Sequence, residues 1–159
     1  MEIKTGYLYH IKDEYFDLIN EKEVMINHKK GHSRPSYYVI KDKDILWFIP
    51  LSSQIEKYKK IIDNKIKKHG NCKTIMIQKI ADKEQVILIQ NAFPTIEKYI
   101  KSKHTVDGRF IEVPYKVRKL ILENFNYILS LKKSGLNLFF TDIDKIKEKM
   151  LIELEKDNK

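Results

Sequence analysis

One arginine and two neighbouring serines are the residues best suited to hold a phosphate. Arg34 precedes a predicted strand, and Ser52 and Ser53 follow the next predicted strand. A tight hairpin returns its end beside its beginning, so these three side chains are expected to lie close together. A guanidinium beside hydroxyls can stabilise the charge that builds on phosphate oxygens when the 2′-OH of RNA attacks its own backbone. Two simpler roles compete, because a serine here could cap a helix and the arginine could form a surface salt bridge.

Other familiar catalytic sites are absent from the sequence. It contains no glycine-rich phosphate loop, no pair of histidines at metal-binding spacing and no carboxylate cluster. Cys72 is the single cysteine, which excludes an intramolecular disulfide and a cysteine-based zinc site. The five histidines are scattered along the chain and predict no catalytic pair: His10, His28, His32, His69 and His104. We therefore expect neither a metal nor another cofactor.

The composition indicates one folded domain with an anionic partner. Hydrophobic residues make up 42% of the 159 residues and charged residues 33%, which is typical of a globular chain. The net charge of +9 favours a polyanion as partner, although only three of the 31 basic residues are arginines and an AT-rich genome inflates lysine. No apolar stretch is long enough to cross a bilayer. We expect a single domain over 1–159, a cytoplasmic location and no membrane partner.

Short strands and helices must position the candidate residues. In order, the pattern predicts a strand over Gly6–Ile11, a helix over Lys12–Asn20, a hairpin of Ser36–Lys41 and Ile45–Pro50, a helix over Gln54–His69, a hairpin of Lys73–Lys79 and Gln85–Gln90, a short helix over Thr95–Lys101, a loop over Ser102–Gly108, a strand over Arg109–Val113, and helices over Tyr115–Lys133 and Asp142–Glu155. Pro50 is expected to end its strand, and Ser52 or Ser53 to cap the next helix. The segment 21–34 shows neither the periodicity of a helix nor that of a strand.

The order of these elements predicts the fold class. The strands are short and their connections are those of antiparallel pairs, with no alternation of strand and helix typical of a parallel sheet. We predict an α+β fold with a small, strongly bent antiparallel sheet or partial barrel, decorated with helices and closed by a C-terminal helical pair.

Four fragments, in the same order and at similar distances, carry a resemblance to a known family. They are YLYHIKDEYFDLI near the N-terminus, Pro50-Leu51-Ser52-Ser53, Asn91-Ala92-Phe93-Pro94 and Pro114-Tyr115-Lys116. Across nearly its whole length the chain resembles the RNA-cleaving toxins of type III toxin–antitoxin systems, the ToxN/AbiQ group and most closely its CptN branch. The run Gly31-His32-Ser33-Arg34-Pro35 is also similar to the start of the MazF/Kid toxins.

The resemblance implies an activity and a partner. Members are phage-defence endoribonucleases that need no metal and leave 2′,3′-cyclic phosphate and 5′-OH ends. They cut target mRNA and process a repeat RNA antitoxin into pseudoknots, which inhibit the toxin in a cyclic toxin–RNA assembly. No protein antitoxin is expected on this reading.

The resemblance also implies the site residues. Ser53 matches the family's active-site serine, Ser52 its hydroxyl neighbour and Tyr15 a tyrosine near the site. The family's catalytic lysine has no lysine counterpart, since Ser33 or Arg34 occupies its region, and an arginine stays protonated and is a poor base. Tyr15, His32, Lys30 or a water could take the proton. The residues expected to bind the RNA are Lys29, Lys30, Lys57, Lys59, Lys60 and Asn91.

Three other functions fit the same residues. The chain could be a non-catalytic RNA-binding module that uses the same basic surface. It could be a MazF-like toxin with a protein antitoxin, or a basic domain with a purely structural role.

Overall fold

The computed structural model describes residues 1–20, 28–29 and 32–158, and for 28–29 and 32–33 it describes the backbone alone. This part of the chain contains helices α1 (Asp13–Ile19), α2 (Ile55–His69), α3 (Tyr115–Lys133) and α4 (Ile143–Asp157), with short 3-10 turns η1 (Ile89–Asn91) and η2 (Glu97–Tyr99). The strands are β1 (Leu8–Ile11), β2 (His28–Lys29), β3 (His32–Ser33), β4 (Ser36–Asp42), β5 (Ile45–Ser52), β6 (Met76–Ile80), β7 (Lys83–Ile87), β8 (Phe93–Thr95), β9 (Ile100–Lys103), β10 (Thr105–Val106) and β11 (Arg109–Phe110).

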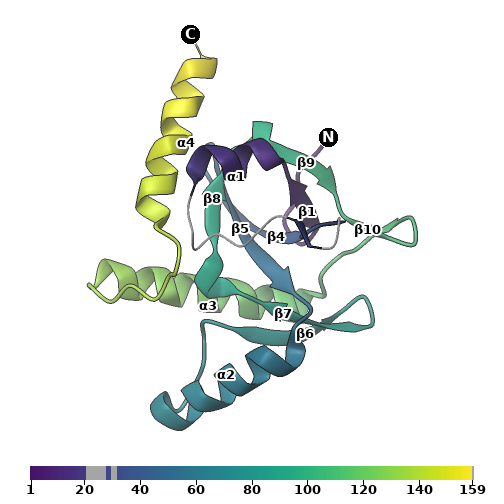
Figure 1. Cartoon of the computed structure of the whole chain (residues 1–159), viewed down its shortest axis with the longest axis vertical. Coiled ribbons are helices and arrows are strands. Elements are labelled where there is room, and N and C mark those ends of the chain that lie inside the picture. The colour runs from purple at the N-terminus through teal and green to yellow at the C-terminus, as the bar shows by residue number, and fades with distance from the viewer. Residues whose placement is uncertain (21–27, 30–31, 159) are drawn as a thin grey trace.

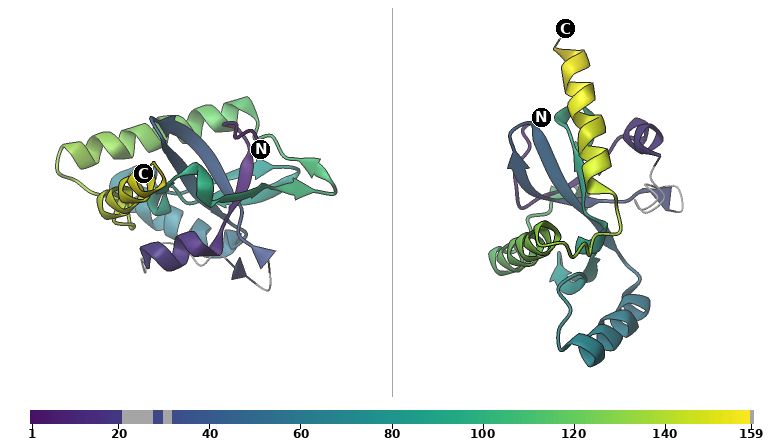
Figure 2. Two further views of the ribbon diagram at one scale, coloured as in Figure 1. Left: turned by 90° about the horizontal axis from the view of Figure 1, so that it is seen from above. Right: turned by 90° about the vertical axis from the view of Figure 1, so that its left-hand side faces the viewer.

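Seven strands form one antiparallel sheet in the order β6–β7–β5–β4–β1–β9, with β8 paired to β5 outside this path. β5 changes partner along its length, because Leu46, Trp47 and Phe48 pair with β8 whereas Leu51 and Ser52 pair with β7. The shared strand makes the sheet bend strongly (Figures 1 and 2). Among the described strands the two ends of the order, β6 and β9, do not pair with each other, so the sheet is open rather than a closed barrel. The predicted α+β class is confirmed.

Helices cover the sheet on both faces. Adjacent residues of a strand point to opposite faces. The ring of Trp47 meets Phe125 of α3 at 5.7 Å between centroids, whereas Phe48 stacks on Phe93, which in turn contacts Tyr15 of α1. α3 and α1 therefore lie on opposite faces, and α2 and α4 extend toward opposite ends of the molecule (Figure 1).

The two central hairpins form as predicted, but the second has different bounds. Its strands are β6 and β7 rather than Lys73–Lys79 and Gln85–Gln90, because the chain turns into η1 at Ile89. The turn after β4 is made by Lys43 and Asp44, with Lys43 at φ +57°, and the turn after β6 by Ala81 and Asp82 at +54° and +62°. Left-handed residues at these positions suit two-residue hairpin turns. Pro50 does not end β5, contrary to expectation, because the strand continues to Ser52 and the Leu51 amide donates to the Pro35 carbonyl at 3.3 Å.

The main helices also match their predictions. α2 stops at Gly70, whose φ of +81° suits a residue without a Cβ. α3 begins directly after Pro114, and the Asp142 carboxylate caps α4 by accepting from the Lys145 amide at 3.2 Å. No helix among the described residues is both long and apolar enough to cross a membrane.

The predicted helix over Thr95–Lys101 is wrong. Ile96, Tyr99 and Ile100 recur at helical spacing, but Thr95 instead pairs with Leu46 as the end of β8, and η2 leads directly into β9. Pairing with β5 and β1 outweighs a weak local preference for helix. The predicted loop over 102–108 likewise contains the end of β9 and all of β10, and the predicted strand over 109–113 is limited to β11.

The strands β2 and β3 were not predicted, because two residues are too few to show a period.

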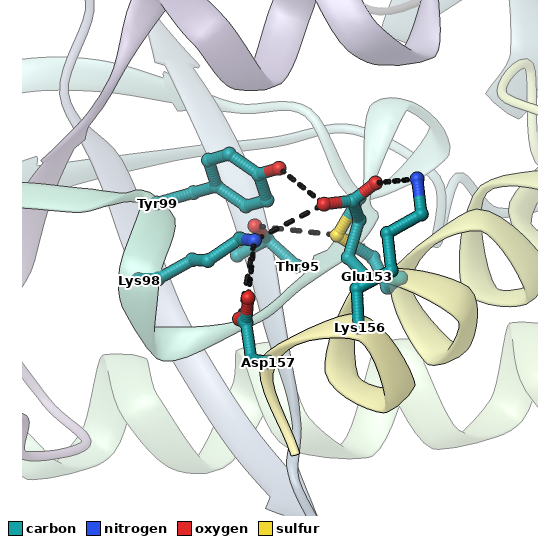
Figure 3. A network of polar contacts seen from close by, with 7 residues as sticks. Thr95, Lys98, Tyr99, Glu153, Lys156 and Asp157 are labelled. Atoms are coloured by element: carbon teal, nitrogen blue, oxygen red, sulfur yellow. Dashed lines mark hydrogen bonds and ion pairs between the residues drawn. The ribbon is translucent and has the colours of Figure 1, made fainter. Parts of the chain in front are cut away.

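α4 is fastened to η2 by a network of ion pairs (Figure 3). Lys98 reaches Glu153 at 3.0 Å and Asp157 at 3.1 Å, and Tyr99 donates to Glu153 at 3.4 Å. Beneath this network the Thr95 hydroxyl lies 4.0 Å from the Met150 sulfur in the core. The second of the closing helices is therefore held against β8 and η2.

Candidate functional site

The end of β5 meets Arg34 at one corner of the sheet. We call this the Arg34 corner and define it as Arg34, Ser52, Ser53 and the first turn of α2. Arg34 Nη1 donates to the Leu51 carbonyl at 2.8 Å. The hairpin therefore brings the arginine beside the serine pair, as the spacing predicts.

The two serines of the corner differ in exposure. Ser52 is buried, pairs with Val86 of β7, and its Oγ accepts from the Gln54 amide at 3.2 Å. Ser53 is exposed and follows the last residue of β5. The N-cap of α2 is Gln54, which makes no side-chain cap bond, so the expected capping by Ser52 or Ser53 is not seen. Of the two hydroxyls, that of Ser53 is open to a ligand.

The corner is positively charged. Partial burial lowers the pKa of Arg34, and the Tyr58 phenol offsets part of this shift, but a guanidinium remains protonated at neutral pH. Lys57, Lys59 and Lys60 are exposed on the first two turns of α2, and the ammonium of Lys57 lies 5.1 Å from the Tyr58 ring. The first amides of α2 add partial positive charge at the same place. Such a corner can bind a phosphate group.

Tyr15 and Asn91 lie away from the accessible part of the corner. Tyr15 has an exposed fraction of 0%, and its hydroxyl donates to the Pro94 carbonyl at 2.7 Å. Complete burial raises the pKa of Tyr15 well above its usual value, so the phenol is a hydrogen-bond donor of the core. Asn91 is buried in η1. In this conformation neither side chain can reach RNA.

Three further predicted residues belong to the segment before Arg34. Lys29 and His32 face one another in the register of β2 and β3, where the backbone alone is described. Lys30 lies outside the described residues. Their roles in catalysis or RNA binding stay predictions.

The structure brings together two histidines that are 94 residues apart. Nε2 of His10 lies 2.8 Å from Nδ1 of His104, joining β1 to the segment after β9. Burial lowers the pKa of both rings, and the positive charge of Lys101 and a neighbouring imidazole help to bring that of His10 to about 4. Both rings are therefore neutral at pH 7. No spacing in the sequence signals the pair, because it depends on strands far apart in the chain.

No group of three or more histidine, cysteine or carboxylate side chains that could hold a metal occurs among the described residues.

Comparison with known proteins gives a likeness of fold. No protein-family model and no curated sequence matches the chain. Among solved structures the chain is similar to AbiQ, a lactococcal anti-phage endoribonuclease belonging to the type-III toxin-antitoxin system. The TM-score is 0.75 at 16% sequence identity, over 96% of this chain and 99% of AbiQ. The predicted likeness in fold is confirmed.

Proposed function

We propose that this protein is a metal-independent endoribonuclease toxin of a type III toxin–antitoxin system. The observation that carries the proposal is the fold shared with AbiQ, which extends over 96% of this chain and 99% of that protein. The Arg34 corner supplies the chemistry, because its charge and its exposed hydroxyl suit a phosphate of an RNA backbone.

In the proposed reaction the 2′-oxygen attacks the adjacent phosphorus while the bond to the 5′-oxygen breaks. The products are a 2′,3′-cyclic phosphate and a 5′-OH end. Arg34 stabilises the charge that develops on the non-bridging oxygens, and Ser53 donates a hydrogen bond to one of them. Ser52 contributes by holding the turn, since its Oγ accepts from the Gln54 amide.

Two proton transfers accompany this step. One group removes the proton of the 2′-OH, and another protonates the departing 5′-oxygen. Arg34 is unsuited to the first transfer because it stays protonated. Tyr15 is enclosed in the core, which leaves His32, Lys30 or a water from the sequence-based candidates.

The proposed partners are RNAs. Lysines of α2 would bind the backbone of target mRNA, and a repeat RNA would be cut into pseudoknots that occupy the corner as an antitoxin in a cyclic assembly. AbiQ is described as anti-phage, and defence against phage is the biological role that we propose here.

The test is cleavage of a mixed RNA pool by the purified protein in EDTA, with the cut ends mapped. We expect 5′-OH ends. Replacing one donor to a developing oxyanion lowers a rate about 10²–10³-fold, which is the loss expected for Ser53→Ala and for Arg34→Gln. Ser134→Ala, an exposed serine after α3, is the matched control and should cleave like the wild type.

The outcomes separate the proposal from a non-catalytic RNA-binding module. Cleavage that needs a divalent metal, or that Ser53→Ala leaves intact, would contradict the proposed chemistry. Binding without cleavage, unchanged in Ser53→Ala, would favour the module.

A further inference from the structure

A second basic and aromatic surface lies on the other side of β4 from the Arg34 corner. We call it the Arg118 surface and define it as Tyr7, Lys103, Phe110, Tyr115, Arg118 and Lys119. These residues come from the N-terminal segment, the end of β9, the β10–β11 hairpin and the first turns of α3. The backbone of Tyr7 forms an isolated antiparallel β-bridge with Glu112, and the Val113 amide donates to the Gly6 carbonyl at 2.7 Å. These contacts join the N-terminal segment to the chain between β11 and α3, and the pairing of Tyr9 with Lys103 joins β1 to β9.

One end of the surface presents aromatic rings around a lysine. The ammonium of Lys103 lies 4.4 Å from the Tyr7 ring and 4.6 Å from the Phe110 ring. Phe110 is nevertheless 59% exposed, and its hairpin projects beyond the sheet (Figures 1 and 2). A projecting, exposed phenylalanine beside a cation offers a stacking platform for a nucleobase.

The other end is a pocket of about 210 Å³ between β4 and α3, lined by Tyr37, Tyr115, Arg118 and Lys119 among others. Its volume is below the roughly 300–1,000 Å³ of sites for drug-sized ligands, so it suits one nucleotide group. Tyr115 is 69% exposed and lies 5.9 Å from the Arg118 guanidinium. The pocket thus repeats the combination of ring and cation.

Arg118 is held in place but is incompletely paired. Its Nη2 lies 3.6 Å from the exposed Glu112 carboxylate, and its Nε is buried without a hydrogen-bond partner among the described residues. The guanidinium lies against Gly6, where a Cβ would come within 2.6 Å of Nη1. Gly6 therefore permits this placement, in which the Arg118 side chain stays 31% exposed. An arginine beside an exposed carboxylate can exchange this weak surface pair for a phosphate.

The use of arginine supports a nucleic-acid ligand. Of the 31 basic residues only three are arginines, and two of them, Arg109 and Arg118, are on or beside this surface. Arginine binds phosphate with a planar fork and stacks on bases, which lysine does not do. A plain cation surface for solubility would require neither arginine nor exposed rings.

We propose that the Arg118 surface is a second RNA-binding surface, which holds unpaired nucleotides of the RNA that occupies the Arg34 corner. This inference rests on the proposed function for the identity of the ligand. Tyr37 of the pocket lies three residues after Arg34, about 10 Å along an extended strand and on the opposite face of it. An RNA that occupies both places therefore passes around the end of β4. Phe110 and Tyr115 stack on bases, and Lys103, Arg118 and Lys119 bind phosphates.

Binding of a fluorescent, single-stranded RNA with 2′-O-methyl groups tests the inference, since the blocked hydroxyl prevents cleavage. We expect Phe110→Ala and Tyr115→Ala each to weaken binding at least about fivefold, in line with loss of one base stack. Tyr127→Ala is the matched control: Tyr127 is 44% exposed on the same helix and also lies beside a lysine, Lys73, at 5.1 Å. It should bind like the wild type.

Cross-linking of wild-type protein to RNA with 4-thiouridine gives a readout that needs no variant. We expect cross-linked peptides from the 103–119 region as well as from the Arg34 corner. Cross-links confined to the corner, or Phe110 and Tyr115 variants that bind RNA like the wild type, would overturn the inference. If the wild type still cleaves RNA, such a result would refute the second surface alone and leave the proposed function intact. Absence of both cleavage and RNA binding would refute the proposed function as well.

Discussion

The contact between His10 and His104 ties the end of β1 to the segment after β9, and it should make the fold sensitive to acid. Burial and the neighbouring charges bring the pKa of His10 to about 4, below the value of about 6.5 expected in the unfolded chain. The unfolded state therefore takes up a proton first as the pH falls. The contribution of His10 to the free energy of unfolding is fully present above about pH 6.5 and is lost as the pH falls from about 6.5 to 4.

We expect the free energy of unfolding to fall by about 1 kcal/mol between pH 7.5 and 5 from this group, after allowing for partial exposure of the ring. His10→Asn should lose this part of the pH dependence, measured by urea unfolding at both values. The control is His69→Asn, at the exposed end of α2, which should keep the wild-type profile. An unchanged profile in His10→Asn would contradict the assignment.

At the residue scale the sequence predicts pairs that a single hairpin creates. Arg34 and Ser52 belong to one hairpin, so their proximity follows from a turn of two residues. His10 and His104 depend on the pairing of β1 with β9, which no local pattern specifies. The sequence resemblance predicts a site role for Tyr15, but whether its hydroxyl points to solvent or to the Pro94 carbonyl depends on the packing of α1.

At the scale of elements, a network on α4 stabilises the least regular part of the sheet. Glu153 accepts from Lys98 at 3.0 Å, from Lys156 at 3.3 Å and from the Tyr99 hydroxyl at 3.4 Å (Figure 3). The Glu153 side chain is only 14% exposed, and the hydrogen bonds and charges of Lys98 and Lys156 lower its pKa. A partly buried carboxylate that accepts three hydrogen bonds stabilises the fold more than an isolated ion pair on the surface does.

Glu153→Gln should therefore reduce the free energy of unfolding by about 0.5–1 kcal/mol at neutral pH. The mutant amide keeps the shape of the side chain and removes its charge. Glu148→Gln, at an exposed position of the same helix, should change stability by less than about 0.5 kcal/mol. Urea unfolding of the two variants compares them directly, and equal effects would show that the network adds nothing.

Helices with a clear apolar periodicity could be predicted from the sequence, whereas short strands defined by their pairing with distant strands could not. α2 and α3 carry apolar stripes over three or more turns. α2 ends at Gly70, and α3 begins directly after Pro114. The segment Thr95–Lys101 has the spacing of a helix but lies within β8, η2 and β9. Its conformation is decided by the edges of β5 and β1, which are distant in sequence and invisible to a local pattern.

At the scale of the whole molecule, charge and shape together limit how RNA can bind. The net charge is +9, and α2 carries its exposed lysines at one end of the long axis while α4 extends toward the other end (Figure 1). Lys65 is the exception on α2, because its ammonium turns inward to Thr74 at 2.9 Å and Gln90 at 3.3 Å. The remaining lysines near the Arg34 corner are free to approach a phosphate backbone.

The salt dependence of RNA affinity, which reflects counterion release, tests this arrangement. Each phosphate neutralised on a single strand contributes about −0.7 to the slope of log Kobs against log salt. Replacing Lys57, Lys59 and Lys60 by glutamine should therefore make the slope shallower by up to about 2 if all three bind phosphates. Fluorescence anisotropy with an RNA that cannot be cut, at several salt concentrations, gives the slope.

The matched control removes the same charge elsewhere. Lys41, Lys133 and Lys145 are exposed and lie on β4, α3 and α4, away from the corner. If only net charge attracts RNA, both triple variants will weaken binding equally and by the same change in slope. If the α2 lysines lie along the bound strand, the slope will change in their variant alone, since condensed counterions are released only where protein and phosphate meet. Equal slopes would thus refute a defined path of RNA over α2 while leaving general attraction intact.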